Sequence, residues 1–587
     1  MTDYQLLKPA GKEQKKESSF AALAKLLPLL REEKRTMFLA SLAIVLNSFL
    51  TLLAPVLIGY AIDTYIQTKQ YGGIFLFSGI LLAIYCVAFF ASFVQMRLMG
   101  GVGQRVLFRL RDAIFHKLQE LPVAFFNQNK AGDLISRINN DTDKLNQFFS
   151  QSLMQLIGNL FVIIGAAIFI LVINVRLGTA ALLPAAALLV FTQLTSHFIR
   201  KKNAQSLTAG GGMSAEIQES LDNFKVIVAF NRRDYFRRKF SEANEYNYQT
   251  SLRAGYANNV YIPVYGFSSN VAQLIVLAYG IYLISTGSFT AGLLISFLIY
   301  CTRFYDPLRQ IASIWASFQV AMAGLDRITA ILALESDLAI LQDATREQTT
   351  SLLEFRHVSF RYPDGKEVLH DINLALEPGK TYALVGPTGG GKTTTASLMA
   401  RLYDPTAGTV LLHGKDLRSY TATERTASIS FILQEPFLFS GTVGENILYG
   451  NPQYTGFTTE KLQEVLKEAN LLTLLERFEQ GLETKVSGGD SISLGQKQLI
   501  AFMRAVLRKP ELLILDEATA NIDTVTEQQL EEILKKLPAS TTKVIIAHRL
   551  NTIENADEIY FVNGGTIIRA GSMQDAVDML LHDKRKS

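Results

Sequence analysis

The chain has 587 residues, too many for a single hydrophobic core, so at least two domains are expected. Apolar residues make up 49% of it and charged residues only 19%, which is too apolar for an ordinary soluble protein. The net charge of +4 is too small to indicate a nucleic-acid partner, and two cysteines exclude a disulfide framework or a cysteine-rich zinc site.

The first half of the chain is predicted to form an all-α membrane domain, residues 21–334. Residues 1–20 are polar and lysine-rich and are predicted to be a disordered tail, followed by an interfacial helix, Phe20–Leu30. Six apolar stretches are then long enough to cross a bilayer, which takes about 20 helical residues. They are Met37–Tyr60, Ile74–Met96, Leu153–Ile173, Leu177–Phe198, Val264–Ser285 and Ala291–Ala312.

Lysine and arginine gather in two long segments, one between the second and third stretches and one between the fourth and fifth. Because basic segments face the cytoplasm, both segments and both termini are expected there. Both segments have helical periodicity, so the spans are expected to extend as helical hairpins with a short docking helix at each tip. The candidates for these docking helices are Val123–Asp133 and Met213–Asn223.

The sixth stretch contains two charged residues, Arg303 and Asp306, three positions apart on one helix face. Charges inside spans are costly and are functional candidates by default. The spacing allows an ion pair, and we interpret the two as a structural or gating pair in preference to a substrate contact.

Residues 335–351 are polar and indicate a linker, and residues 352–587 have the pattern of an α/β domain. In this domain a predicted strand, Thr381–Val385, leads into a loop of the form G-x-x-x-x-G-K-[ST], and a helical stretch from Thr394 to Leu402 follows. The loop residues are Gly386, Pro387, Thr388, Gly389, Gly390, Gly391, Lys392, Thr393 and Thr394. Such a loop cradles nucleotide phosphates with its backbone, Lys392 reaches the β- and γ-phosphates, and the Thr393 hydroxyl holds Mg²⁺.

Two further apolar strands end in side chains that suit nucleotide hydrolysis. Leu512–Asp516 ends in Asp516, which can hold Mg²⁺, and Glu517 follows it, placed to orient and polarise the attacking water. Lys543–His548 ends in His548, which can donate to a γ-phosphate, although a lone histidine in this position is more often a capping or core residue.

With Ile492-Ser493-Leu494-Gly495-Gln496 ahead of Asp516, these residues resemble those of ATP-binding cassette (ABC) exporters, in which six spans are fused to one nucleotide-binding domain. The resemblance implies a multidomain membrane protein: an all-α six-helix transmembrane domain and an α/β P-loop ATPase domain. It makes ATP and Mg²⁺ the ligands, Tyr362 the residue that stacks on adenine, Gln434 a residue near Mg²⁺, and His548 the switch histidine. It also implies that Ser493, Leu494, Gly495 and Gln496 form a signature that acts on ATP held by a second half-transporter.

Leu494 stands where this family has the first glycine of its L-S-G-G-Q signature, whereas the phosphate loop, Glu517 and His548 match. This combination resembles one half of a heterodimeric exporter and favours a heterodimer. A homodimer that tolerates leucine stays open.

The resulting hypothesis is a dimeric, ATP-hydrolysing exporter that moves drugs, lipids or peptides by alternating access. It is expected in the cytoplasmic (inner) membrane, in contact with membrane lipid, with its nucleotide-binding domain in the cytoplasm. The alternative is a regulatory membrane protein or channel gated by ATP. Glu517 argues against it, because a purely regulatory protein can dispense with hydrolysis, and vectorial transport would separate the two.

Overall fold

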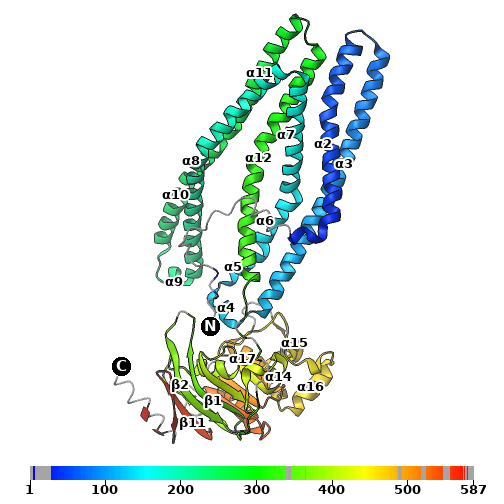
Figure 1. The fold of residues 1–587 in the computed structure, drawn as a ribbon. Helices are drawn as coiled ribbons and strands as arrows, with labels where there is room; N and C mark the ends of the chain where they lie inside the picture. The colour runs from blue at the N-terminus through cyan, green and yellow to red at the C-terminus, as the bar shows by residue number, and fades with distance from the viewer. Residues whose placement is uncertain are drawn as a thin grey trace. The chain divides into compact units, whose positions relative to one another are not determined.

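The computed structural model describes residues 4, 6, 28–336, 338, 340–341, 345–363, 365–486, 492–516, 524–546, 555–572, 574–575 and 578–579. The chain forms two compact units (Figure 1). A helical unit holds residues 10–118 and 132–333, and a nucleotide-binding unit holds residues 1–9, 119–131 and 334–587. Residues 119–131, at the tip of the first hairpin, therefore belong with the nucleotide-binding unit.

The helical unit is built from helices that continue well beyond the apolar stretches. They are α2 (Lys34–Ala61), α3 (Tyr71–Glu120), α7 (Leu153–Ile173), α8 (Val175–Asp222), α10 (Arg233–Asn259), α11 (Tyr261–Ser285) and α12 (Ala291–Leu332). The shorter elements η1 (Pro28–Glu33), η2 (Ile62–Ile66), α5 (Ala131–Ser136), η3 (Arg137–Asp141), α6 (Thr142–Gln147) and η4 (Phe148–Ser152) connect them. Only the end of the expected interfacial helix lies in the described residues, within η1.

Among the described residues, five helical segments are long and apolar enough to cross a membrane, and they contain the first five predicted spans. The sixth prediction lies in α12, which is not among the five. Charged residues, Arg303 and Asp306 among them, lower the hydropathy of this helix. The role of α12 as a span therefore stays a prediction.

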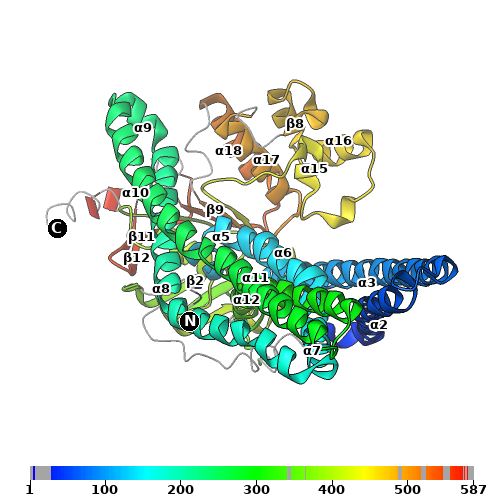
Figure 2. The same ribbon diagram turned by 90° about the horizontal axis from the view of Figure 1, so that it is seen from above.

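α12 packs against α2, α7 and α11 (Figures 1 and 2). Its buried face, which includes Phe297, Tyr300 and Phe304, forms one apolar cluster with side chains of α2, α7, α8 and α11. At its outer start, an oxygen of Asp63 accepts a hydrogen bond from the backbone N–H of Gly292 at 2.8 Å. Because a carboxylate satisfies an otherwise unpaired N–H at a helix start, this contact fixes the start of α12 beside the end of α2.

α8 and α10 lie side by side, and the short helix α9 (Phe224–Ala229) lies between them in sequence at the hairpin tip (Figure 1). The predicted docking helix Met213–Asn223 is therefore wrong in position, because α8 continues unbroken to Asp222 and the helix breaks at Asn223. The first prediction, Val123–Asp133, contains the short helix α4 (Val123–Gln128) and the start of α5.

The nucleotide-binding unit contains two main sheets. One has six strands in the order β12-β11-β3-β10-β9-β6, in which β12 alone is antiparallel to its neighbour. Its strands are β3 (Thr381–Val385), β6 (Ile429–Ile432), β9 (Leu512–Asp516), β10 (Thr542–Ile546), β11 (Glu558–Asn563) and β12 (Thr566–Ala570). Its parallel strands are largely apolar and buried, as a sheet covered on both faces requires.

The second sheet is antiparallel, in the order β2-β1-β4-β5. Its strands are β1 (Leu353–Arg361), β2 (Glu367–Leu376), β4 (Ala407–Leu412) and β5 (Lys415–Asp416). The helices of the unit are α13 (Lys392–Met399), α14 (Ala422–Ser428), α15 (Val443–Leu448), α16 (Thr459–Glu468), α17 (Leu494–Val506) and α18 (Thr524–Lys536). Buried side chains of β9, α15, α16 and α17 form its largest described apolar core.

Two residues of the predicted disordered tail, Tyr4 and Leu6, are packed in this unit. Tyr4 is buried with its ring edge-on to Phe125 of α4, and its hydroxyl donates to the backbone oxygen of Glu335 at 3.0 Å. The Asn129 side chain donates to the backbone oxygen of Tyr4 and accepts from the N–H of Leu6. The expectation of disorder is wrong for these two residues, because polar composition does not reveal contacts with segments far along the chain.

Candidate functional site

The candidate nucleotide site lies at the carboxyl ends of four neighbouring parallel strands, β3, β10, β9 and β6. The register places Ile546 of β10 level with both Leu384 of β3 and Asp516 of β9, and Ile432 of β6 level with Leu515. The segments that follow these strands therefore leave the sheet at one edge, where ligands bind in open α/β sheets.

The sequence-predicted residues follow those strand ends. The phosphate loop follows β3, Asp516 ends β9, and Gln434 comes two residues after β6. Glu517 and His548 follow β9 and β10 in sequence, but they lie outside the described residues. The strand order thus brings the described site residues to one edge of the sheet.

The glycines of the phosphate loop are required by close backbone contacts. A Cβ atom on Gly386 would lie 2.0 Å from the backbone oxygen of Val562, and one on Gly390 would lie 2.6 Å from the same atom. Gly391 has a φ of 115°, in the left-handed region that favours glycine, and it is the N-cap of α13. This cap starts the helix at Lys392, two residues earlier than the predicted Thr394.

Lys392 and Thr393 are the first two residues of α13, directly after the glycines of the loop. The Lys392 ammonium donates to the backbone oxygens of Gly386 and Pro387 at 2.8 and 3.0 Å, so it lies over the loop. The Thr393 hydroxyl is 3.4 Å from a carboxylate oxygen of Asp516, which is only 1% exposed. Ammonium and helix N–H groups suit phosphate, and adjacent hydroxyl and carboxylate oxygens suit Mg²⁺.

Among the residues that the structure describes, no three or more histidine, cysteine or acidic side chains are grouped so that they could hold a metal ion. Mg²⁺ is usually held by one or two protein oxygens together with substrate phosphates and water. Gln434, the third predicted Mg²⁺ neighbour, is exposed after β6. Thr393 and Asp516 would hold the ion, and it would neutralise phosphate charge during hydrolysis.

The predicted adenine-stacking residue, Tyr362, is held by a small aromatic cluster. Its ring is edge-on to Phe360 and Tyr403, with centroids 4.8 and 5.3 Å away, and its hydroxyl is 3.1 Å from that of Thr394. The Tyr403 hydroxyl in turn accepts a hydrogen bond of 2.7 Å from Asn127 of α4. Burial raises the pKa of Tyr403, so its phenol stays neutral at pH 7 and available for this bond.

Sequence reasoning missed both Asn127 and Tyr403. Their contact joins segments 276 residues apart, which no periodicity or motif in one sequence reports. The only available signal was the expectation of a docking helix at this point of the chain. The contact connects α4 to the aromatic cluster of the nucleotide site.

Replacing Tyr362 with alanine is expected to weaken ATP affinity by ~1–3 kcal/mol, because a stacked base loses its aromatic partner. Titration with a fluorescent ATP analogue measures this. Tyr362→Phe is the matched control: it keeps the ring, loses only the hydroxyl contact with Thr394, and is expected to retain most of the affinity. Unchanged affinity in the alanine variant would remove Tyr362 from the site.

The predicted signature begins α17. Ser493 is the N-cap: its hydroxyl accepts from the N–H of Gln496, and the Gln496 side chain accepts from the N–H of Ser493. Gln496 also donates to the backbone oxygen of Arg477 at 2.8 Å, which holds the helix start in place. A hydroxyl that accepts here keeps its own proton, so Ser493 can still donate to a phosphate.

Leu494, the first residue of α17, is 44% exposed and does not have a positive φ. Its backbone conformation is therefore available to any residue, and glycine's conformational freedom is not needed here. What leucine adds is bulk at an exposed helix start.

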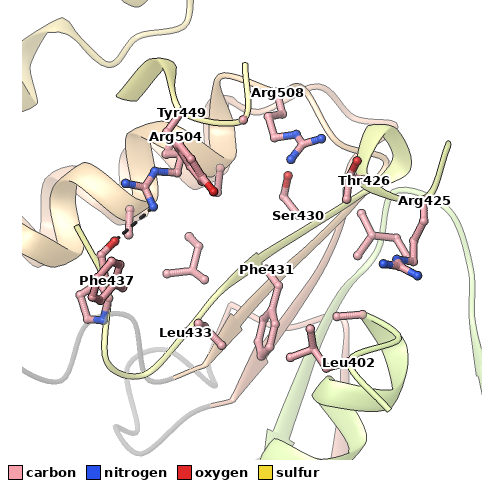
Figure 3. Close-up of a pocket in the computed structure, with 17 residues that line it drawn as sticks. Leu402, Arg425, Thr426, Ser430, Phe431, Leu433, Phe437, Tyr449, Arg504 and Arg508 are labelled. Atoms are coloured by element: carbon pink, nitrogen blue, oxygen red, sulfur yellow. Dashed lines mark hydrogen bonds between the residues drawn. The ribbon is translucent and has the colours of Figure 1, made fainter. Parts of the chain in front are cut away.

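A groove of about 300 Å³ lies in the same unit, lined by residues of α14, β6, α17 and the segment after β6 (Figure 3). Leu433 and Pro436, on either side of Gln434 in sequence, are part of its lining. Arg504 donates to the backbone oxygen of Phe437 at 3.2 Å, and its guanidinium lies over the Tyr449 ring. The groove is thus an apolar trough with arginines, adjoining the segment that carries Gln434.

Comparisons with known proteins match both halves of the chain. Residues 37–308 match the family described as ABC transporter transmembrane region, and residues 369–520 match the family described as ABC transporter. The uncharacterized ABC transporter ATP-binding protein YfiC of Bacillus subtilis is 33% identical over 97% of this chain and 94% of its own length. A fatty acid ABC transporter ATP-binding/permease protein of Mycobacterium tuberculosis is 33% identical, over 84% of this chain and 77% of its own. A multidrug resistance ABC transporter ATP-binding and permease protein of Lactococcus lactis subsp. cremoris is 31% identical, over 85% and 84%.

Proposed function

Since the chain belongs to the ABC transporters, with a transmembrane region ahead of an ATP-binding domain, we propose that it is one half of a dimeric exporter of hydrophobic or amphipathic molecules. The observation that carries the proposal is the meeting of the phosphate loop, Asp516 and the segment with Gln434 at one sheet edge, in a chain with five helical segments able to cross a membrane. ATP hydrolysis is coupled to transport in this family.

In the proposed hydrolysis, each residue has a separate task. The loop glycines and Lys392 bind the phosphates, and Thr393 and Asp516 hold Mg²⁺. Glu517 orients the attacking water and accepts its proton, and His548 donates to the γ-phosphate. Gln434 lies close to the metal. The parallel order of β3, β10, β9 and β6 supports this assignment.

We further propose that the functional unit is a dimer in which Ser493 and the start of α17 contact ATP bound to the partner. Unpaired N–H groups at a helix start and the proton on Ser493 suit a γ-phosphate. The bulk of Leu494 obstructs this approach, which favours a heterodimer in which the partner carries the better signature. ATP then holds the two nucleotide-binding units together, and hydrolysis releases them.

The groove of Figure 3 is proposed as the seat of a docking helix from the partner subunit. This chain's own α4 contacts Tyr403 instead. α9, the second short helix, exposes Phe224, Val226 and Phe230, which are 56%, 54% and 75% exposed. An apolar helix of this kind fits an apolar trough. Seating it beside Leu433 and Pro436 would move the segment with Gln434, which links the spans to the nucleotide site.

The proposal also covers the substrate class and the membrane. One relative is named for fatty acids and another for multidrug resistance, which supports a hydrophobic or amphipathic cargo. Drugs, lipids and peptides are the classes of cargo that we propose. The five apolar segments support a multi-pass protein in contact with lipid, and we place it in the cytoplasmic (inner) membrane with the nucleotide-binding unit in the cytoplasm.

Reconstitution of the full chain in sealed vesicles, together with any subunit that co-purifies, tests the proposal. We expect Mg²⁺-dependent ATP hydrolysis and ATP-driven movement of a rhodamine dye or a fluorescent phospholipid between the two sides. The Lys392→Ala variant in identical vesicles is the control for passive leakage. Hydrolysis without any vectorial movement, together with ATP-gated ion flux, would favour the regulatory or channel alternative instead.

A further inference from the structure

One face of α12 carries charge and amide groups inside an otherwise apolar unit. The exposed residues recur at intervals of three and four, which places them on a single helix face. They are Thr302, Arg303, Asp306, Arg309, Gln310 and Ser313. We call this set the polar face of α12. The opposite face, with Phe297, Tyr300 and Phe304, is buried against the neighbouring helices.

The depth of the polar face follows from helix geometry. α12 begins at Ala291, and each helical residue rises 1.5 Å, so Arg303 lies ~18 Å from the outer start of the helix and Asp306 ~22 Å. A hydrocarbon core is ~30 Å thick. If α12 spans the membrane as proposed, both charges lie within the core, and Arg309, at ~27 Å, lies near its inner boundary.

The charges on this face have no partner in the described part of the chain. The expected ion pair between Arg303 and Asp306 does not form, and Arg309 makes no ion pair with any described residue either. The i,i+3 spacing permits contact but does not require it, and here the side chains stay apart. The structural ion pair expected within this subunit is therefore wrong, and a gating role of the two residues stays a prediction.

Neighbouring helices extend the same polar surface. Gln310 is 3.3 Å from Asn159 of α7, and Thr302 is 3.4 Å from Gln273 of α11. Polar groups thus continue from α12 onto α7 and α11, both of which pack against it. Charged side chains without a partner, and the amide groups beside them, are strongly disfavoured where they face lipid. The surface therefore faces water or a polar ligand, which in a transporter is the substrate path.

We propose that the polar face of α12 binds the anionic headgroup of an amphipathic substrate, with Arg303 and Arg309 as its ligands. The inference rests on the proposed exporter function and narrows its substrate class. Two arginines against one aspartate give this face a positive excess, and guanidinium groups suit carboxylate or phosphate oxygens. Asp306, between them in sequence, lowers the positive excess of this face and repels an anionic headgroup. The apolar surface of the unit is left to accommodate the substrate's tail.

The chain offers a built-in reporter for a binding test, because Trp315 of α12 is its only tryptophan. Energy transfer from Trp315 to a dansyl label can be measured for the full chain in dodecylmaltoside micelles, which contain no tryptophan, and without nucleotide. The probes are dansyl-labelled undecanoic acid and its uncharged amide, which have equal tails. We expect the acid to bind about tenfold more tightly than the amide.

The variants separate headgroup binding from other roles. Arg303→Gln and Arg309→Gln are each expected to weaken the acid about tenfold and leave the amide unchanged, whereas Asp306→Asn binds the acid at least as tightly. Arg303→Lys keeps the charge and should retain the preference for the acid, which guards against misfolding as the explanation. Arg176→Gln, an exposed arginine at the start of α8, is the matched control and should behave as the unaltered chain.

Equal affinity for acid and amide, or arginine variants that keep the full preference, would overturn the proposal. Arginine variants would also keep the preference for the acid if the arginines pair with acidic groups of the partner subunit. Competition by unlabelled oleate and by phosphatidylglycerol distinguishes a carboxylate ligand from a phosphate ligand. The binding test contains no nucleotide, so it is independent of the transport measurement in vesicles. Binding of the acid without transport in vesicles would count against the exporter function alone. Transport in vesicles without a preference for the acid would count against this site alone.

Discussion

The Glu517→Gln variant is expected to bind ATP normally and to lose hydrolysis by ~10²–10⁴-fold at the site that contains Lys392. An amide has almost the same size as a carboxylate, but it cannot accept a proton from water. Asp516 ends β9 beside Thr393, and Glu517 is the next residue in the sequence. Phosphate release measures hydrolysis, and a fluorescent ATP analogue measures binding in the same preparation.

Glu511→Gln is the matched control for this variant. Glu511 precedes β9 at the opposite edge of the sheet, where its carboxylate contacts His413 and accepts from Ser428. Its change is expected to leave both binding and hydrolysis near normal, apart from a small loss of stability. Normal turnover in Glu517→Gln at the Lys392 site would refute the assignment of Glu517, whereas loss of turnover in both variants would indicate a general defect.

Two strands and the phosphate loop of the candidate nucleotide site were predictable because their signals are local. β3 and β9 have the predicted bounds, Thr381–Val385 and Leu512–Asp516, since a parallel strand buried on both faces is a short, continuous apolar run. The phosphate loop follows from glycines that must lie against the backbone of Val562. The spacing of the glycines and of the apolar runs along the chain therefore predicts the phosphate loop and its neighbouring strands directly.

Contacts between distant segments were not predictable in the same way. The aromatic cluster at Tyr362 depends on Tyr403 and, through it, on Asn127 of α4. Tyr4 of the tail is buried against α4 as well. Each contact is decided by how the segments pack, which one sequence without relatives does not report.

Two errors in the helical unit have a common origin. A separate docking helix was expected at Met213–Asn223, but α8 runs unbroken to Asp222, packed along α10. Arg303 and Asp306 have the spacing of an ion pair, yet they remain apart on an exposed face. In both cases local spacing gave the possibilities, and packing selected among them.

Leu494→Ala is expected to raise ATP hydrolysis by the chain alone, by about tenfold or more, if the altered signature limits a dimer of two copies. The size follows from catalytic hydrogen-bond donors: loss of one preorganised donor to developing charge typically costs ~10²–10³ in rate. Leucine is exposed at the start of α17, where its side chain would lie between that helix and a phosphate on the partner. Phosphate release by the purified full chain in lipid measures the effect.

Leu494→Gly separates the two ways in which leucine could act. The backbone at this position does not require glycine, so bulk is the only obstacle, and alanine should recover as much hydrolysis as glycine does. Glycine should also cost up to about 1 kcal/mol of stability in the first turn of α17.

Recovery with glycine but not alanine would show that backbone freedom matters when the dimer closes. Strong hydrolysis by the unaltered chain, unchanged in both variants, would instead mean that two copies work together and the leucine is tolerated. Low hydrolysis in all three, with ATP still bound, would point to a partner that supplies more than a better signature.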